Sequence, residues 1–374
     1  MKKEYLPLST TTGRLYIITE KIKQNAEDLE EFLIGNEYMN SKKFSENVLF
    51  SQEIKANNTV EGYKDDISLV NDIVKKKLKI KDKEKMYRIK NLYDGYRFIF
   101  DCKEINKENL RHLYNILSNK LLDSYEIDNM GEFYRNKDVF IFFSSNMDVE
   151  PDKGYNPENI EKYMDEYFNY AKDINIEDTM TSHFVKSQIM HFQFVNIHPY
   201  FDINGRTSRT TAMWYLLNNK AYPYIIFNRG IMLNKHKYYK VIKDVKEYHN
   251  VTFFVNYMLD NVRIELEKEY IIDMIKSVNN NLSAVDYQTI YYILSMNSNL
   301  TAKDFMTFYN RNNDKKNSLE IYNNMIVPLL DKKIIVRIKE TNSGISPYIK
   351  NFEFKLNDSM YEKDTSKIKR LKLK

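Results

Sequence analysis

The most informative segment of this chain is residues 198–209, His-Pro-Tyr-Phe-Asp-Ile-Asn-Gly-Arg-Thr-Ser-Arg. Apolar residues at helical spacing precede it, and they predict a helix over residues 178–196. Pro199 disfavours helical geometry at the residue before it, so this helix should end near His198. A second helix is predicted over residues 207–217, beginning around 204–207. Two helices joined by a short polar loop therefore form the centre of the predicted fold.

The residue types in this loop suit phosphate chemistry. The N-terminus of a helix favours phosphate through its free N–H groups and partial positive charge. Arg206 and Arg209 share one helix face and can together hold a polyphosphate. Asp202 supplies the single carboxylate with which Mg²⁺ is commonly held beside phosphate oxygens. His198 titrates near neutral pH, so it is the candidate base.

Each of these residues also has an ordinary explanation. A histidine in a loop is often structural, a pair of arginines on one helix face is often solvated, and an aspartate before a helix is often a cap. The coincidence of all of them within residues 198–209 favours the functional interpretation.

Composition excludes several nucleotide-binding classes. The chain has 374 residues, 43% hydrophobic and 29% charged, as in ordinary globular proteins. It has 9 glycines, and they are widely separated in the sequence. The P-loop, the GxGxxG dinucleotide fold and the protein-kinase glycine loop all require clustered glycines, so all three are excluded.

Charge and cysteine content set further limits. Cys102 is the one cysteine, which excludes an internal disulfide and a cysteine-based zinc site. The net charge of +5 does not by itself demand nucleic acid. The chain shows no leader-like segment and no apolar run long enough to cross a bilayer. We therefore expect a cytoplasmic protein with no membrane contact.

Hydrophobic periodicity predicts a mainly α-helical protein. The run Val139-Phe-Ile-Phe-Phe143 is an exception, because a β-branched and aromatic run between polar residues indicates a strand or hairpin. Besides the two helices of the central segment, helices are predicted at residues 14–33, 41–60, 65–79, 84–100, 106–121 and 157–171.

The pattern changes after residue 280. Three predicted helices (283–294, 301–308 and 318–330) precede a strand at 334–338, a turn at 340–344 and a second strand at 348–354. This order is typical of a winged helix-turn-helix, so residues 280–358 are expected to contact DNA or to serve self-association or docking of a protein. Residues 359–374 form a basic tail, either simply solvated or in contact with an anionic partner.

Residues 198–209 resemble the Fic motif, HPFx(D/E)GNGRxxR. Tyr200 stands where the motif has Phe, and Ile203 where it has the first Gly of GNG. The resemblance continues over residues 192–227, and residues 134–141 resemble the flap hairpin of the family. It implies a Fic-type helical bundle with a β-hairpin flap at residues 106–270, after an N-terminal helical region at 1–105.

Most enzymes of this family transfer AMP from ATP to a protein hydroxyl and release pyrophosphate. By resemblance, His198 is the base that deprotonates a target Ser, Thr or Tyr, and Asp202 binds Mg²⁺. The implied nucleotide-binding residues are Asn204, Gly205, Arg206 and Arg209 at the phosphates and Tyr238 and Tyr239 at adenine. For the two tyrosines, plain core packing is an equally open explanation. Flap residues Val139, Phe140 and Ile141 would pair with the target backbone.

Residues 54–62 resemble the family's inhibitory helix, (S/T)xxxE(G/N), with Asn57 in place of Ser or Thr. The resemblance implies a helix around residues 50–62 whose Glu61 pairs with Arg209 and takes that guanidinium from the γ-phosphate. Ile203 raises a separate question. Glycine tolerates a positive φ and a β-branched residue does not, so either the loop avoids that conformation or the anion hole is altered.

The leading interpretation is a protein adenylyltransferase using ATP and Mg²⁺ and restrained by its own N-terminal helix. In some relatives the same glutamate supports removal of AMP, so the reverse reaction is open. Two alternatives remain: a Fic-type transferase with another donor (UMP, phosphocholine or phosphate), and a DNA-binding regulator with a decayed Fic core. A decayed core should have lost some polar residues of the motif, and none is lost.

Overall fold

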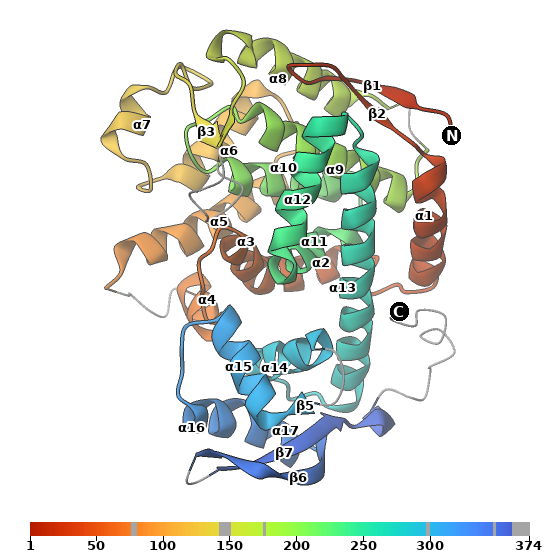
Figure 1. The fold of residues 1–374 in the computed structure, drawn as a ribbon, viewed down its shortest axis with the longest axis vertical. Coiled ribbons are helices and arrows are strands. Elements are labelled where there is room, and N and C mark those ends of the chain that lie inside the picture. Colours follow the sequence, from red (N-terminus) through yellow and green to blue (C-terminus); the bar gives the residue numbers. More distant parts are fainter. Residues whose placement is uncertain (76–80, 142–150, 175–176, 297–299, 347–348, 361–374) are drawn as a thin grey trace. The chain divides into compact units, whose positions relative to one another are not determined.

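The computed structural model describes residues 1–75, 81–141, 151–174, 177–296, 300–346 and 349–360. The part of the predicted flap beyond Ile141 and the tail from residue 361 lie outside the described residues. The chain forms two compact units (Figure 1). One comprises Met1–Gly62 and Ile73–Arg263, and the other Tyr63–Asp72 and Ile264–Lys374. The predicted boundary between residues 105 and 106 falls inside the first unit.

Helices dominate the first unit, as the apolar periodicity predicts. Helices α9 (Met180–Ile197) and α10 (Asn204–Asn218) form its centre, and nearly all of their side chains are buried. A helix that is buried all round belongs to a core rather than to a surface. The other helices of this unit are α1 (Glu20–Leu33), α2 (Lys42–Val48), α3 (Ile54–Val60), α5 (Lys83–Asp101), α6 (Lys107–Ser118), α7 (Ser124–Asp128), α8 (Pro157–Lys172), α11 (Phe227–Leu233) and α12 (Lys235–Tyr248).

The predicted helix over residues 14–33 is wrong in its first turn. Strands β1 (Glu4–Ser9) and β2 (Arg14–Ile17) form an antiparallel hairpin, and α1 begins only at Glu20. Leu15 and Ile17 are buried while the residues around them are more exposed, which is the two-residue alternation of a strand. Pairing with β1 decides the conformation of this segment, and helical spacing in one stretch of sequence cannot reveal such a partner.

The helix predicted over residues 41–60 is confirmed, but it contains a π-helical turn. This turn, Leu49–Glu53, joins α2 to α3. Glu53, at its end, is fully buried, and its Oε1 lies 2.7 Å from Nε of Arg229 on α11. This ion pair holds the start of α3 inside the first unit.

The second unit has the order of elements predicted for residues 280–358. Helices α14 (Ala284–Ser295) and α15 (Ala302–Asn312), then helical residues 318–331, precede strands β6 (Ile335–Ser346) and β7 (Ile349–Leu356). Two details differ. Strand β6 runs through the predicted turn, and a strand too short to show alternation, β5 (Leu300–Thr301), pairs with β7. Helices α4 (Ile67–Val74) and α13 (Thr252–Val278) carry the chain between the units.

None of the helices among the described residues combines the length and the apolar character that crossing a membrane requires.

Candidate active site

The loop between α9 and α10 has left-handed backbone conformations at both ends. His198, which ends α9, has φ 54°, and Ile203, which precedes α10, has φ 65°. The loop therefore does adopt at Ile203 the conformation that glycine tolerates best. A left-handed conformation costs an ordinary residue roughly 1–2 kcal/mol, which the surrounding contacts must offset. Asn204 supplies two of them, because its amide donates to the Tyr200 carbonyl (2.8 Å) and accepts from the Tyr200 N–H (3.0 Å).

His198 is prepared to accept a proton. Burial lowers the pKa of its imidazole to about 4, with smaller contributions from the charges of Arg135 and Lys246. The ring is therefore neutral near pH 7. Its Nδ1 lies 3.2 Å from the Val195 carbonyl, which can only accept, so Nδ1 carries the hydrogen. Nε2 is left with its lone pair available.

Arg135 connects the base of the flap to this loop, and sequence reasoning did not assign it a role. Its side chain is buried and donates to the carbonyls of His198 (2.8 Å), Lys137 (2.6 Å) and Tyr155 (2.6 Å). Its own N–H donates to the Pro199 carbonyl (3.0 Å). An arginine beside a predicted strand is the only sequence signal for it, and that signal is weak.

The two motif arginines differ in their present partners. Arg206 is 5% exposed, and its one described ion-pair partner is Asp202, at 4.0 Å. Its Nε is buried without a hydrogen-bond acceptor among the described residues. The Asp202 carboxylate is 58% exposed. Both side chains are therefore placed to accept further partners, an anion at Arg206 and a cation at Asp202.

Arg209 is already engaged by α3. Its Nη2 donates to Oε1 of Glu61. Its Nε and Nη2 also donate to Oδ1 of Asn57, at 2.9 and 2.7 Å. Asn57 is held in turn by a hydrogen bond from its amide to the Tyr96 hydroxyl (3.0 Å). Asn57, which departs from the family pattern, therefore binds the arginine directly.

Glu61 lies over the first turn of α10. A Cβ atom added to Gly205 would collide with Glu61 Oε1, so the carboxylate packs directly on the backbone of that turn. Burial opposes the charge of Glu61, but Arg209 and Arg206 outweigh it and hold its pKa below the usual range. A carboxylate thus lies at a helix N-terminus, bound to Arg209 and stabilised electrostatically by Arg206, where these groups would also favour a phosphate.

The two tyrosines of α12 have different surroundings. Tyr238 is buried, and its hydroxyl lies 2.9 Å from Nε2 of His191. Tyr239 is half-buried, and its hydroxyl donates to the Val60 carbonyl (3.4 Å). The Lys235 ammonium lies 5.6 Å from the centre of the Tyr239 ring. Of the two tyrosines, Tyr239 is the one whose side chain is partly exposed.

The described part of the flap is a short antiparallel ladder. Strand β3 (Phe140–Ile141) pairs with β4 (Asp152–Lys153). Val139 and Ile141 are buried, and Phe140 is 60% exposed. The structure thus brings the predicted base, anion-binding residues and inhibitory glutamate into one site, and the Arg135 contacts tie the base of the flap to the His198 loop.

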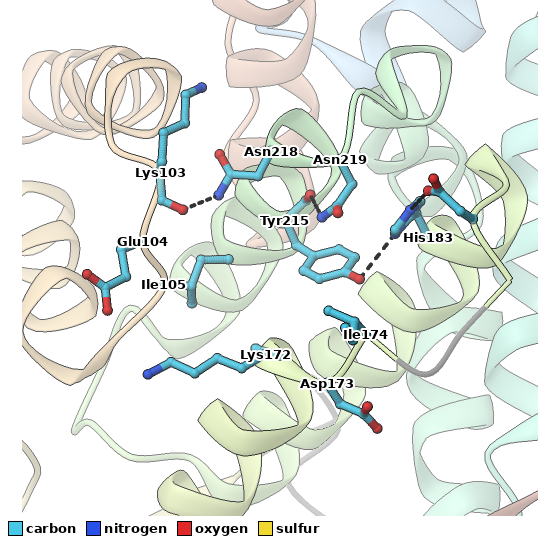
Figure 2. A pocket seen from close by; sticks show the side chains of 12 residues that line it. Lys103, Glu104, Ile105, Lys172, Asp173, Ile174, His183, Tyr215, Asn218 and Asn219 are labelled. Carbon is cyan, nitrogen blue, oxygen red and sulfur yellow. Dashed lines mark hydrogen bonds and ion pairs between the residues drawn. The ribbon is translucent and has the colours of Figure 1, made fainter.

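A cavity lies apart from this site. Its volume is about 480 Å³, and its lining includes the C-terminal ends of α8 and α10 and the N-terminal part of α9. None of the predicted site residues lines it. Within it, the His183 ring lies 3.2 Å from the Tyr215 hydroxyl, as Figure 2 shows, and its other nitrogen lies 2.8 Å from the Asp178 carboxylate. Among the described residues, no group of three or more His, Cys, Asp or Glu side chains is placed to hold a metal ion.

Comparisons with known proteins agree with this geometry. The model of the Fic/DOC family matches residues 104–216. A protein adenylyltransferase Fic from Culex quinquefasciatus is 35% identical over 88 residues, which are 23% of this chain and 17% of that protein. A Fic family protein from Desulfovibrio desulfuricans has a similar fold, with a TM-score of 0.55 and 19% identity over 91% of this chain and 95% of that one.

The motif geometry, the family match and the shared fold lead to one conclusion: residues 104–216 of this chain form a Fic domain. The matched residues include His198, Arg209 and the described flap, and they exclude α3 and α12. The chain spans about a sixth of the length of the curated relative, so what that relative does as a whole is carried over only as a proposal.

Proposed function

We propose that this chain transfers AMP from ATP to a hydroxyl side chain of a target protein and that α3 holds it inactive. The observation that carries the proposal is the position of Glu61, bound to Arg209 and packed on Gly205 at the first turn of α10. An anion-binding site and an internal anion that fills it are the two parts that a restrained phosphoryl-type transferase needs.

The proposed reaction begins at His198. Its neutral Nε2 takes the proton of the target hydroxyl, and the hydroxyl oxygen forms a bond to the α-phosphorus of ATP. The bond from that phosphorus to the bridging oxygen breaks, and pyrophosphate leaves with the electron pair. The pKa of about 4 keeps His198 unprotonated at neutral pH, so the ring is ready as a base before ATP arrives.

The phosphates of ATP would be held by α10. The free N–H groups of its first turn, Arg206 and Arg209 supply the positive charge. Asp202 is exposed, its ion-pair partner among the described residues is Arg206 at 4.0 Å, and it is an oxygen ligand, so it fits Mg²⁺, which would neutralise phosphate charge there. The Asn204 side chain is occupied by Tyr200, so its part in the anion hole is to fix the loop whose N–H groups bind.

The brake is proposed to act by competition. Arg209 directs Nη2 to Glu61, and a γ-phosphate needs the same guanidinium. With Glu61 in place, the terminal phosphate is displaced and the α-phosphorus is no longer in line with the attacking oxygen. Tyr239, which is partly exposed whereas Tyr238 is buried, is the better candidate for contact with adenine, and the flap would pair with the target backbone.

The test uses ATP labelled in either the α- or the γ-phosphate, with Mg²⁺ and the Glu61→Gly protein. We expect the α-label to become covalently attached to the protein and the γ-label not to. Attachment of the γ-label would replace AMP transfer by phosphate transfer. If neither label attaches although the protein binds ATP, the donor is another nucleotide. The other donors and a DNA role for residues 280–358 stay predictions.

A further inference from the structure

The second unit contains a cavity of its own. Its volume is about 370 Å³, and all of its lining residues belong to that unit. They come from the start of α4, one face of α14, the end of α15 with the loop that follows, and the helical turn Tyr322–Ile326. Ile67, Val285 and Met325 make part of the lining apolar. Small-molecule sites commonly have ~300–1,000 Å³ and a mainly apolar lining with a few polar groups, so the cavity can hold a small ligand.

Gln288 lines this cavity, and its amide has no partner. The residue is 3% exposed, and its Nε2 and Oε1 are both buried without a hydrogen-bond partner among the described residues. Its neighbours in the lining are bonded: the Thr289 hydroxyl donates to the Val285 carbonyl (2.7 Å), and the Asn313 amide donates to the Tyr309 carbonyl (2.8 Å). A buried amide without partners costs free energy, so the site favours a ligand that supplies both a donor and an acceptor.

The Gln288 amide can reach a ligand by a change in its own rotamer. Glutamine has three rotatable side-chain bonds, and the preferences of the last one are broad. Turning the amide toward the cavity breaks no hydrogen bond with the described residues, because it makes none with them. A water molecule takes about 30 Å³ in the liquid, so one bound water would leave most of this cavity unfilled. The size of the cavity therefore favours an organic ligand.

The charged groups of the lining pair with each other or with a neighbour. Oδ1 of Asp66 accepts from the Tyr309 hydroxyl (2.7 Å), and its Oδ2 lies 3.2 Å from the Lys316 ammonium. The Lys316 ammonium also lies 3.2 Å from the Glu320 carboxylate. A charged ligand would have to break one of these pairs or remain uncompensated at a half-buried position. The cavity therefore favours an uncharged ligand.

We propose that this cavity binds a small uncharged molecule that has a hydrogen-bond acceptor and an N–H donor side by side, as amides and nucleobases have. The acceptor takes a hydrogen bond from Gln288 Nε2, and the N–H donates to Gln288 Oε1. A glutamine amide makes this paired contact with the N6 and N7 atoms of adenine when proteins bind DNA, so the geometry is attainable. The proposal concerns the second unit and does not depend on the transferase function.

Four matched probes test the proposal by ligand-observed NMR titration of the full chain. Benzamide is uncharged and has both groups, acetophenone has only the acceptor, benzoate is an anion and benzylammonium is a cation. We expect benzamide to bind roughly tenfold more tightly than acetophenone, because acetophenone leaves Gln288 Oε1 without a donor. The two ions should bind more weakly than benzamide. Adenine and uracil, titrated in the same way, show whether the site prefers a nucleobase or a simple amide.

Three variants locate the contact. Gln288→Leu keeps the size of the side chain and removes both polar atoms, so the affinity for benzamide should fall to that for acetophenone. Because the amide has no partner to lose among the described residues, this variant should not unfold at a lower temperature than wild type. Gln24→Leu, at an exposed position of α1, is the control and should leave both affinities unchanged. Ser68→Trp places a large side chain at an exposed position of the lining and should abolish binding.

Several results would overturn the inference. Tighter binding of benzoate or benzylammonium than of benzamide excludes an uncharged ligand. An unchanged preference for benzamide in Gln288→Leu excludes the assigned contact. Binding of none of the probes or nucleobases would leave the cavity to water alone. If Gln288→Leu does not fold, Ser68→Trp decides the question, because undiminished binding of benzamide to that variant places the ligand outside this cavity.

Discussion

The loop at residues 198–209 and the helix α3 meet at Arg209, but they are built in different ways. The loop is contiguous in sequence, and its left-handed residues at 198 and 203 and the hydrogen bonds between Asn204 and Tyr200 lie within it, while Arg135 binds two of its carbonyls from outside. Helix α3 is held by side chains from other parts of the chain: Tyr96 and Arg209 bind Asn57, and Arg229 binds Glu53 just before the helix. The candidate catalytic loop is formed mostly within one stretch of sequence, whereas the proposed brake is part of the packed core.

This difference bears on how the proposed brake would be released. Glu53 and Asn57 are fully buried, whereas the side chain of Glu61 is 28% exposed. Moving the whole helix would break a buried ion pair and several hydrogen bonds. Moving the Glu61 side chain alone breaks the contact with Arg209. We therefore expect release to involve the glutamate side chain, with α3 remaining in place.

The largest expected effect is in the loop. His198→Ala, introduced into the Glu61→Gly protein, should lower the rate of self-labelling by roughly 10²–10⁴-fold, because the proton of the hydroxyl has no other base. Labelling is followed with α-labelled ATP, and ATP binding should persist. An undiminished rate would remove His198 from the mechanism.

Glu53→Gln tests whether the start of α3 belongs to the core. Removing one charge of this buried pair should cost about 3–5 kcal/mol of unfolding free energy. Trp214, the one tryptophan, is buried in the first unit and reports urea unfolding by fluorescence. Glu27→Gln, in an exposed pair on α1, is the control and should leave the transition unchanged. Equal transitions for both variants would contradict the integration of α3.

Asn57→Ala weakens the proposed brake without touching Glu61. The variant removes two hydrogen bonds that the charged Arg209 side chain donates to Asn57, so Arg209 binds α3 less tightly. We expect self-labelling about tenfold above wild type but below Glu61→Gly. Thr59→Ala, on the same helix with its hydroxyl bonded to the Lys55 carbonyl, is the matched control. Labelling of Asn57→Ala at the wild-type level would show that Glu61 alone carries the inhibition.

The smallest expected effect is on the pH profile. Because burial holds the pKa of His198 at about 4, the labelling rate of Glu61→Gly at low ATP should be nearly constant between about pH 8 and about pH 5. An exposed histidine would halve the rate near pH 6.5. In that window the unfolded chain binds a proton that the folded chain does not, so stability falls as the pH is lowered. A loss of activity centred near pH 6.5 would contradict the buried base.

The sequence predicted the helical bundle and the loop because both depend on local patterns. Helical spacing marks α9 and α10, and Pro199 marks the end of the first. The sequence patterns did not predict strand β2, because its conformation depends on pairing with β1, on the other side of a turn. Arg135 was missed for a similar reason: its role comes from the carbonyls of Tyr155 and His198, which lie far away in sequence. The sequence left open whether Ile203 adopts a positive φ, and in the structure its φ is 65°.

The central claim is that Glu61 restrains an AMP transfer that His198 begins. Intact mass spectrometry of three proteins after incubation with ATP and Mg²⁺ tests it most directly: wild type, Glu61→Gly, and Glu61→Gly with His198→Ala. The account predicts a mass increase of one or more AMP groups on Glu61→Gly, little on wild type and none on the double variant. Equal AMP addition to wild type and Glu61→Gly, or addition to the double variant, would contradict it.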